Sequence, residues 1–221
     1  MEQNLSKKTR TESDLIGSRE VPESALYGVQ TLRGIENFRI SKFHLNEYPL
    51  FIQALAITKM GAAVANRELD LLTEEQADAI LKACKEILEG KHHDQFPVDM
   101  IQGGAGTTTN MNANEVIANR ALELMGHQRG EYQYCSPNDH VNRSQSTNDA
   151  YPTAIHIGLY YTHLKLVKHF EVLIESFRKK ATEFAHVIKM GRTQLEDAVP
   201  MTLGQTFNGF ASILRHEGEK L

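Results

Sequence analysis

Three short stretches of this 221-residue sequence are rich in glycine, hydroxyl and amide groups, and could bind a small anion. Residues 102–112 (QGGAGTTTNMN) combine three glycines with three threonines and two asparagines, residues 142–149 read NRSQSTND, and residues 191–194 read GRTQ. Glycine lets the backbone approach a ligand closely, and hydroxyl and amide side chains donate hydrogen bonds without carrying charge. These stretches therefore predict a site that binds a carboxylate mainly through neutral donors.

The first stretch is not a nucleotide-binding P-loop, because it lacks the Gly-Lys-Ser/Thr sequence of that motif. It stands at the predicted start of a helix, where free backbone N–H groups and the helix dipole attract anions. Residues 142–149 precede a second predicted helix in the same way. The same residue types also form glycine turns and helix caps, so a purely structural interpretation of each stretch stays open.

Other residue patterns in the sequence do not support a metal site or a nucleophile. His92 and His93 lie in a polar turn without a ligand-spaced partner, and residues 216–219 (HEGE) lack the second histidine of a zinc-protease helix. Cys84 lies on the apolar face of a predicted helix, which favours a core residue over a nucleophile. We expect neither a metal nor a cofactor.

Apolar residues spaced by three or four positions indicate a mainly α fold. Thr73 starts a capping box, and Gly90 and Gly126 are typical helix stops. Strand signals are weak, so the first 47 residues and residues 190–201 are predicted as irregular segments and loops. The predicted helices cover about residues 27–38, 48–69, 73–88, 112–125 and 155–188, with a last helix that runs to the final residue.

Composition limits the function classes. The sequence is 41% hydrophobic with a formal net charge of −4, which excludes a disordered chain and gives no basic surface for nucleic acid. A chain of this size buries roughly 70% of its surface, enough for a real core. Two cysteines are too few for a disulfide framework, and no apolar run predicts a signal peptide or membrane span. We expect a cytoplasmic protein that binds neither nucleic acid nor a membrane.

Four motifs in register resemble the aspartase/fumarase superfamily, whose members add or remove a small group across fumarate or a fumaryl unit. They are residues 103–112 (GGAGTTTNMN), 137–142 (PNDHVN), 145–149 (QSTND) and 191–200 (GRTQLEDAVP). Thr147, where fumarases usually carry serine, favours the aspartase branch, as do Gln194 and residues 130–134 (GEYQY). The resemblance implies an N-terminal α-rich lyase domain over residues 1–143, followed over 144–221 by the first part of a long central helical bundle.

The resemblance also implies a reaction. In the aspartase branch, a base removes a proton next to one carboxylate of L-aspartate, and ammonia leaves from an enediolate-like intermediate to give fumarate. The substrate-binding residues that the resemblance implies are Thr107, Ser146 and Thr147 for the reacting carboxylate, Asn148 and Gln194 for the amino group, Thr193 for the second carboxylate, and Thr108 and Asn110 for the shape of the loop.

The family's catalytic base is not expected in this chain. In family members it is a serine on a mobile loop of the form GSSxMPxKxN, and no such stretch occurs in these residues. The resemblance therefore implies an N-terminal half, inactive alone, of an enzyme whose sites are assembled from several subunits of a homotetramer. Two alternatives stay open: a fumarate hydratase or other superfamily lyase, and a non-catalytic helical module that binds a dicarboxylate or a partner.

Overall fold

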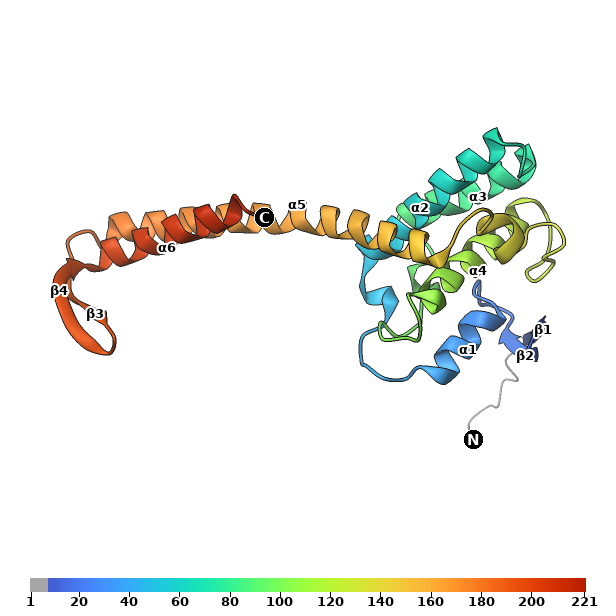
Figure 1. Cartoon of the computed structure of the whole chain (residues 1–221), viewed down its shortest axis with the longest axis horizontal. Coiled ribbons are helices and arrows are strands. Elements are labelled where there is room, and N and C mark those ends of the chain that lie inside the picture. Colours follow the sequence, from blue (N-terminus) through green and yellow to red (C-terminus); the bar gives the residue numbers. More distant parts are fainter. Residues whose placement is uncertain (1–7) are drawn as a thin grey trace. The chain divides into compact units, whose positions relative to one another are not determined.

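A computed structural model describes residues 8–221 and confirms the predicted mainly α fold (Figure 1). The chain divides into two compact units, one ending at Leu159 and one covering Tyr160–Leu221. The predicted domain boundary after residue 143 stays a prediction. The boundary between the two compact units lies after Leu159, inside a helix. None of the helices within residues 8–221 combines the length and the hydropathy that a membrane span requires.

The first unit begins with a β-hairpin where the sequence predicted an irregular segment. Strands β1 (Thr9–Asp14) and β2 (Gly17–Pro22) pair antiparallel, with Thr9 opposite Pro22. The Asp14 carboxylate forms the turn by accepting from the backbone N–H groups of Ile16 and Gly17. The prediction was wrong because polar strands of six residues lack the apolar alternation that identifies a half-buried strand.

Four helices follow in the first unit: α1 (Val29–Asn37), α2 (Pro49–Glu68), α3 (Glu74–Leu88) and α4 (Thr107–Leu124). Short helical turns occupy Leu45–Glu47 and His93–Gln95, and a π-helical turn spans Pro137–Val141. The capping box of Thr73 and Gln76 begins α3 as predicted, and Gly90 and Gly126 have positive φ just after their helices. Side chains that are almost fully buried among these helices include Ile52, Leu55, Ile80, Ile87, Ile117 and Leu122.

Cys84 is fully buried, and burial raises the pKa of its thiol to about 12, so it is an inert core residue as predicted.

Helix α4 begins at Thr107, five residues before the predicted start. Gly106, with φ of +87°, precedes the helix, and the Gln102 side chain accepts from the Thr109 N–H at 2.8 Å. The Thr-Thr-Thr-Asn run is therefore the first turn of α4 and not a loop before it.

Helix α5 (Thr147–Glu183) is a single long helix, eight residues longer at its start than predicted and five shorter at its end. In the second unit it is followed by strands β3 (Ile188–Thr193) and β4 (Glu196–Thr202), an antiparallel pair where a loop was predicted. Gln194 and Leu195 connect the strands with φ of +50° and +67°. Two-residue hairpin turns need such values and usually contain Asn or Gly, which this turn lacks, so no local pattern predicted it.

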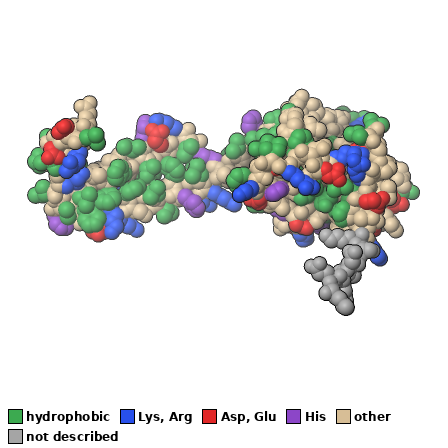
Figure 2. Space-filling model, turned by 90° about the horizontal axis from the view of Figure 1, so that it is seen from below, with side chains coloured by type: hydrophobic (Ala, Val, Ile, Leu, Met, Phe, Trp, Pro, Cys, Tyr) green, Lys and Arg blue, Asp and Glu red, His purple; other side chains and the backbone are tan. Residues whose placement is uncertain are grey.

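Helix α6 (Leu203–Gly218) lies beside the C-terminal part of α5 (Figure 1) and ends at Gly218, not at the last residue as predicted. Phe177 of α5 packs against Phe207 and Phe210 of α6, with ring centroids 6.0 and 5.6 Å apart. Figure 2 shows many hydrophobic side chains gathered on the surface of this second unit. Exposed members of this surface include Leu164, Leu166, Val172, Leu173, Phe210 and Ile213.

Candidate functional site

The starts of α4 and α5 meet at a contact between Gly106 and Tyr151. The Tyr151 ring lies so close to Gly106 that a Cβ atom there would overlap it. Tyr151 also packs edge-on against Phe51 of α2, with ring centroids 5.7 Å apart. Only glycine combines this close approach with the positive φ of residue 106. The contact therefore brings together the two helix N-termini that the sequence predicted as donor clusters.

The hydroxyl groups of Ser146 and Thr147 each accept one hydrogen bond from the protein. Ser146 Oγ accepts from the backbone N–H of Asn148 at 3.2 Å, which makes Ser146 the cap of α5. Thr147 Oγ1 accepts from Asn110 Nδ2 at 3.1 Å. Because a hydroxyl that accepts still holds its own proton, both groups keep one proton to donate. Ser146 is exposed and Thr147 is half-buried, so a ligand can reach them.

Lys59 of α2 is connected through Asn110 to the Thr147 hydroxyl, and the sequence motifs did not identify it. Its side chain is fully buried, and Nζ donates to Asn110 Oδ1 at 2.8 Å, Asn142 Oδ1 at 3.0 Å and Gln145 Oε1 at 2.9 Å. Burial lowers the pKa of Lys59 to about 7. Lys59 follows Leu55 and precedes Ala63 by one helical turn each, so the apolar spacing of α2 could have placed it on the buried face.

Asn142 joins this cluster of amides. Its Oδ1 accepts from Lys59 and from the Nδ2 groups of Asn110 and Asn114, the latter two at 3.1 Å, while its own Nδ2 donates to the Gln145 carbonyl at 3.1 Å. The sequence placed Asn142 and Gln145 in motifs without giving them a role. We call Lys59, Asn110, Asn114, Asn142 and Gln145 the Lys59 network. Within residues 8–221, Asn114 Oδ1 is the one buried amide oxygen of this network that accepts no hydrogen bond.

The other predicted residues of the first unit divide by exposure. Thr107 and Asn148 are exposed at the starts of α4 and α5, whereas Thr108 presses its methyl group against Gly34 of α1. Asn110 is 1% exposed, and its Nδ2 group donates to Thr147 Oγ1, so its side chain is not accessible from the surface. The roles implied for these residues stay predictions.

Thr193 and Gln194 belong to the second unit, at the exposed tip of the β3–β4 hairpin. The backbone of Gln194 has a left-handed conformation, with φ of +50°. This conformation costs a residue other than glycine about 1 kcal/mol or more in conformational free energy. Such strain outside glycine motivates a functional hypothesis. Arg192 pairs with Asp197 at 3.3 Å on the surface of the same hairpin. The association of Thr193 and Gln194 with the residues of the first unit stays a prediction.

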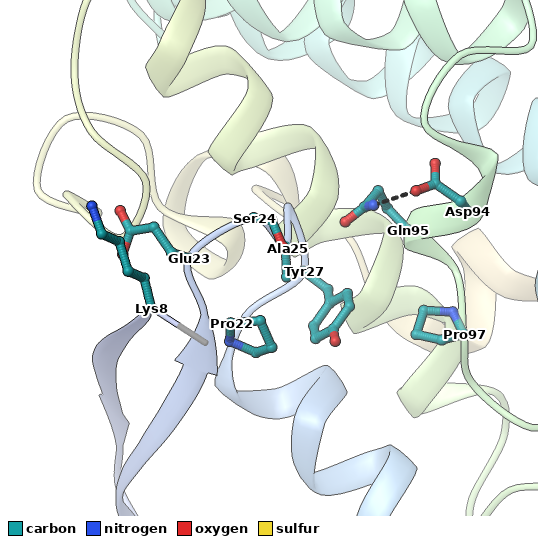
Figure 3. A pocket seen from close by; sticks show the side chains of 9 residues that line it. All are labelled: Lys8, Pro22, Glu23, Ser24, Ala25, Tyr27, Asp94, Gln95 and Pro97. Atoms are coloured by element: carbon teal, nitrogen blue, oxygen red, sulfur yellow. Dashed lines mark hydrogen bonds between the residues drawn. The ribbon is translucent and has the colours of Figure 1, made fainter. Parts of the chain in front are cut away.

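Two other features lie outside this group. Within residues 8–221, no cluster of three or more His, Cys, Asp or Glu side chains could hold a metal, and His92 contacts Glu86 at 2.8 Å. Figure 3 shows a hollow near the first hairpin whose lining contains no residue of the predicted site. Its lining residues are Lys8, Pro22, Glu23, Ser24, Ala25, Tyr27, Asp94, Gln95 and Pro97.

Comparisons with known proteins agree with the four motifs. A family model described as lyase matches residues 17–221. An aspartate ammonia-lyase from Pseudomonas canavaninivorans is 58% identical over 212 residues, which cover 96% of this chain and 45% of the relative. The chain thus spans about half the length of the curated relatives it matches.

Solved structures agree on the fold. The structure of a fumarate lyase:delta crystallin from Brucella melitensis superposes with a TM-score of 0.93 at 52% identity, over 96% of this chain and 46% of that chain. A class II fumarase from Schistosoma mansoni superposes with a TM-score of 0.85 at 38% identity, over 96% of this chain and 44% of that one. The chain therefore belongs to this lyase family, and it is similar to an aspartate ammonia-lyase and to a class II fumarase.

Proposed function

We propose that this chain supplies the N-terminal half of an aspartate ammonia-lyase, which converts L-aspartate to fumarate and ammonia. The observation that carries the proposal is the pair of hydroxyls at the start of α5. Ser146 and Thr147 each accept a hydrogen bond from the protein and keep one proton to donate toward solvent. The 58% identity to an aspartate ammonia-lyase supports L-aspartate as the substrate.

The proposed chemistry needs donors that respond to developing charge. When the proton next to the reacting carboxylate leaves, negative charge spreads onto that carboxylate and makes it an enediolate-like dianion. Donors fixed in place before the reaction stabilise that charge more than they stabilise the substrate. Thr107, Ser146 and Thr147 fit this role, with Asn148 and Gln194 near the amino group and Thr193 near the second carboxylate.

The catalytic base, the oligomeric state and the compartment are properties of the whole protein. The base is a serine of the mobile GSSxMPxKxN loop in family members, a motif that these 221 residues do not contain. The exposed apolar surface of α5 and α6 supports packing against further bundle helices, and we propose a homotetramer (Figure 2). Two free, buried cysteines suit a reducing compartment, which supports the cytoplasm.

Complementation tests the proposal. This chain is co-expressed with the C-terminal remainder of the Pseudomonas canavaninivorans relative, and the purified complex receives L-aspartate or L-malate while fumarate absorbance is followed. We expect fumarate from L-aspartate with the complex and none with the chain alone. Turnover by the chain alone would show that the base lies within it, and turnover of L-malate only would identify a fumarate hydratase.

The likeness to a class II fumarase keeps the hydratase as a second candidate, and the same assay decides between the two. A non-catalytic module makes a different prediction. Calorimetry of fumarate added to the isolated chain would then give saturable binding, while the complex would have no lyase activity with either substrate.

A further inference from the structure

Lys59 has a buried amino group without an acidic partner. Its Nζ has three acceptors, all of them neutral amide oxygens, and Lys59 forms no ion pair among residues 8–221. Three acceptors match the three protons of an ammonium group, whereas a neutral amine has only two protons to give. The surroundings are therefore shaped for the charged form, but they provide no negative charge to balance it.

The groups around Lys59 do not change this balance. From α3, the Cys84 thiol is the titratable group that acts on Lys59, and it is neutral because burial raises its pKa to about 12. On α4, the Glu115 carboxylate points to α1, where it accepts from the backbone N–H groups of Gly28, Gln30 and Thr31. In the segment before α5, His140 contacts Gln76 and the Ser136 N–H. On α2 itself, Arg67 pairs with Asp78 at the surface.

A hydrogen-bonded relay connects Lys59 to the surface of the site. Nζ donates to Asn110 Oδ1, and the Nδ2 group of the same amide donates to Thr147 Oγ1. An amide that accepts from a cation becomes a stronger donor at its nitrogen, so the charge on Lys59 increases the acidity of the Thr147 hydroxyl. A carboxylate bound by Thr147 would lie three hydrogen bonds from Nζ and would supply the missing negative charge.

We propose that Lys59 is a positioning residue that becomes fully protonated when a dicarboxylate binds at Ser146 and Thr147, so that binding takes up a proton. This inference rests on the proposed function, because it takes the ligand from it. Burial lowers the pKa of Lys59 to about 7, which leaves it partly neutral near neutral pH. A bound anion favours the ammonium form and raises that pKa again. The donors proposed to touch the ligand are neutral, and the buried Lys59 lies behind them.

Proton counting by calorimetry tests the proposal. Fumarate is titrated into the complex of this chain with the C-terminal remainder of the relative, in two buffers of different ionisation enthalpy. At pH 8 we expect uptake of roughly half a proton or more per ligand, and close to none at pH 6, where Lys59 is already charged. The affinity should fall about tenfold from pH 7 to pH 9 for the same reason.

Variants assign the proton to Lys59. Lys59→Met should bind fumarate more weakly and without proton uptake, whereas Lys59→Arg, which stays charged at all these pH values, should bind without uptake and keep more of the affinity. Lys85→Met, at an exposed lysine of α3, should match the unchanged chain. If neither Lys59 variant folds, the number of protons taken up by the complex with the unchanged chain at pH 8 and pH 6 decides whether binding takes up a proton.

The outcomes separate the two proposals. Binding without uptake at pH 8, or uptake that persists in Lys59→Met, would overturn the role of Lys59 and leave the proposed function intact. No fumarate binding at any pH would overturn the proposed function, and this inference with it.

Discussion

Tyr151, in the first turns of α5, lies directly against Gly106, the residue that precedes α4. The two residues are 45 positions apart by their numbers, yet their contact joins the helix starts that carry the donor clusters. Asn110 and Thr147 are joined across the same junction by a 3.1 Å hydrogen bond. The candidate site is thus a junction of two helix N-termini near a buried lysine.

Gly106→Ala should disrupt the junction. A methyl group would overlap the Tyr151 ring, and residue 106 would be held at a positive φ that alanine disfavours, so we expect a loss of at least 2 kcal/mol in unfolding free energy. Gly61→Ala is the matched control, because a methyl group meets nothing within 4 Å there and should stabilise α2 by about 0.5–1 kcal/mol. Urea denaturation of both variants checks the difference. Equal effects would contradict the contact.

Thr147→Val should remove the donor while keeping the shape of the side chain. In the complemented enzyme we expect kcat/KM for L-aspartate to fall roughly 100-fold or more, as for the loss of one donor to a developing oxyanion. Thr147→Ser, which keeps the hydroxyl, should recover much of the activity. Thr153→Val, at an exposed position of the same helix, is the control and should have no effect. A less than tenfold change in kcat/KM for Thr147→Val would contradict a role of the Thr147 hydroxyl in substrate binding.

The stability of the chain should rise with pH between 7 and 8.5. Burial lowers the pKa of Lys59 to about 7, while an unfolded lysine has a pKa of about 10.4. In this interval the unfolded chain binds more protons, so the unfolding free energy rises with pH, by about 2 kcal/mol in all. The thiols of Cys84 and Cys135 oppose this above about pH 8.5, because burial raises their pKa to about 12.

Urea denaturation at several pH values measures this slope. Lys59→Met should lose the rise, while Lys85→Met should keep it. A flat profile for the unchanged chain between pH 7 and 8.5 would mean that Lys59 keeps its ordinary pKa in the folded state.

Glu115→Gln should destabilise the attachment of α1 to α4. The carboxylate is 1% exposed and accepts three backbone N–H groups at 2.8–3.0 Å, which an amide with its own N–H protons cannot all accept. We expect a loss of about 2 kcal/mol in unfolding free energy. Glu68→Gln, at an exposed position of α2, should change it by less than about 0.5 kcal/mol. Hydrogen exchange should locate the loss of protection in α1.

Gln194→Gly should separate stability from activity. Glycine adopts the positive φ at the hairpin tip without strain, so the unfolding free energy should increase by about 1 kcal/mol. The same substitution removes the side chain that is proposed to lie near the amino group. Leu195→Gly relieves a similar φ at a 98% exposed residue and should stabilise without lowering kcat/KM. Equal kcat/KM values for the two variants would exclude Gln194 from the site.

Helix periodicity and capping residues predicted most of the helices because these signals are local. Thr73, Gly90 and Gly126 mark helix ends through contacts within a few residues, and the structure places them there. The start of α4 was predicted five residues late, because Thr107, Thr108 and Thr109 are weak helix formers that extend the helix only when Gln102 and Gly106 support its first turn. The first hairpin was missed because its polar strands lack apolar alternation, and the second because its turn uses the strained Gln194–Leu195 pair in place of glycine.

By itself, the sequence determined the mainly α class, the family and the donor clusters, since helical spacing and four motifs in register are properties of the linear chain. Tertiary structure decided what stands behind those clusters. Lys59 is remote in sequence from Asn110 and Gln145, and its burial against their amide oxygens depends on how α2 packs against α4 and the start of α5. Burial and missing countercharge set the pKa of a lysine, and both arise only when distant segments exclude water together.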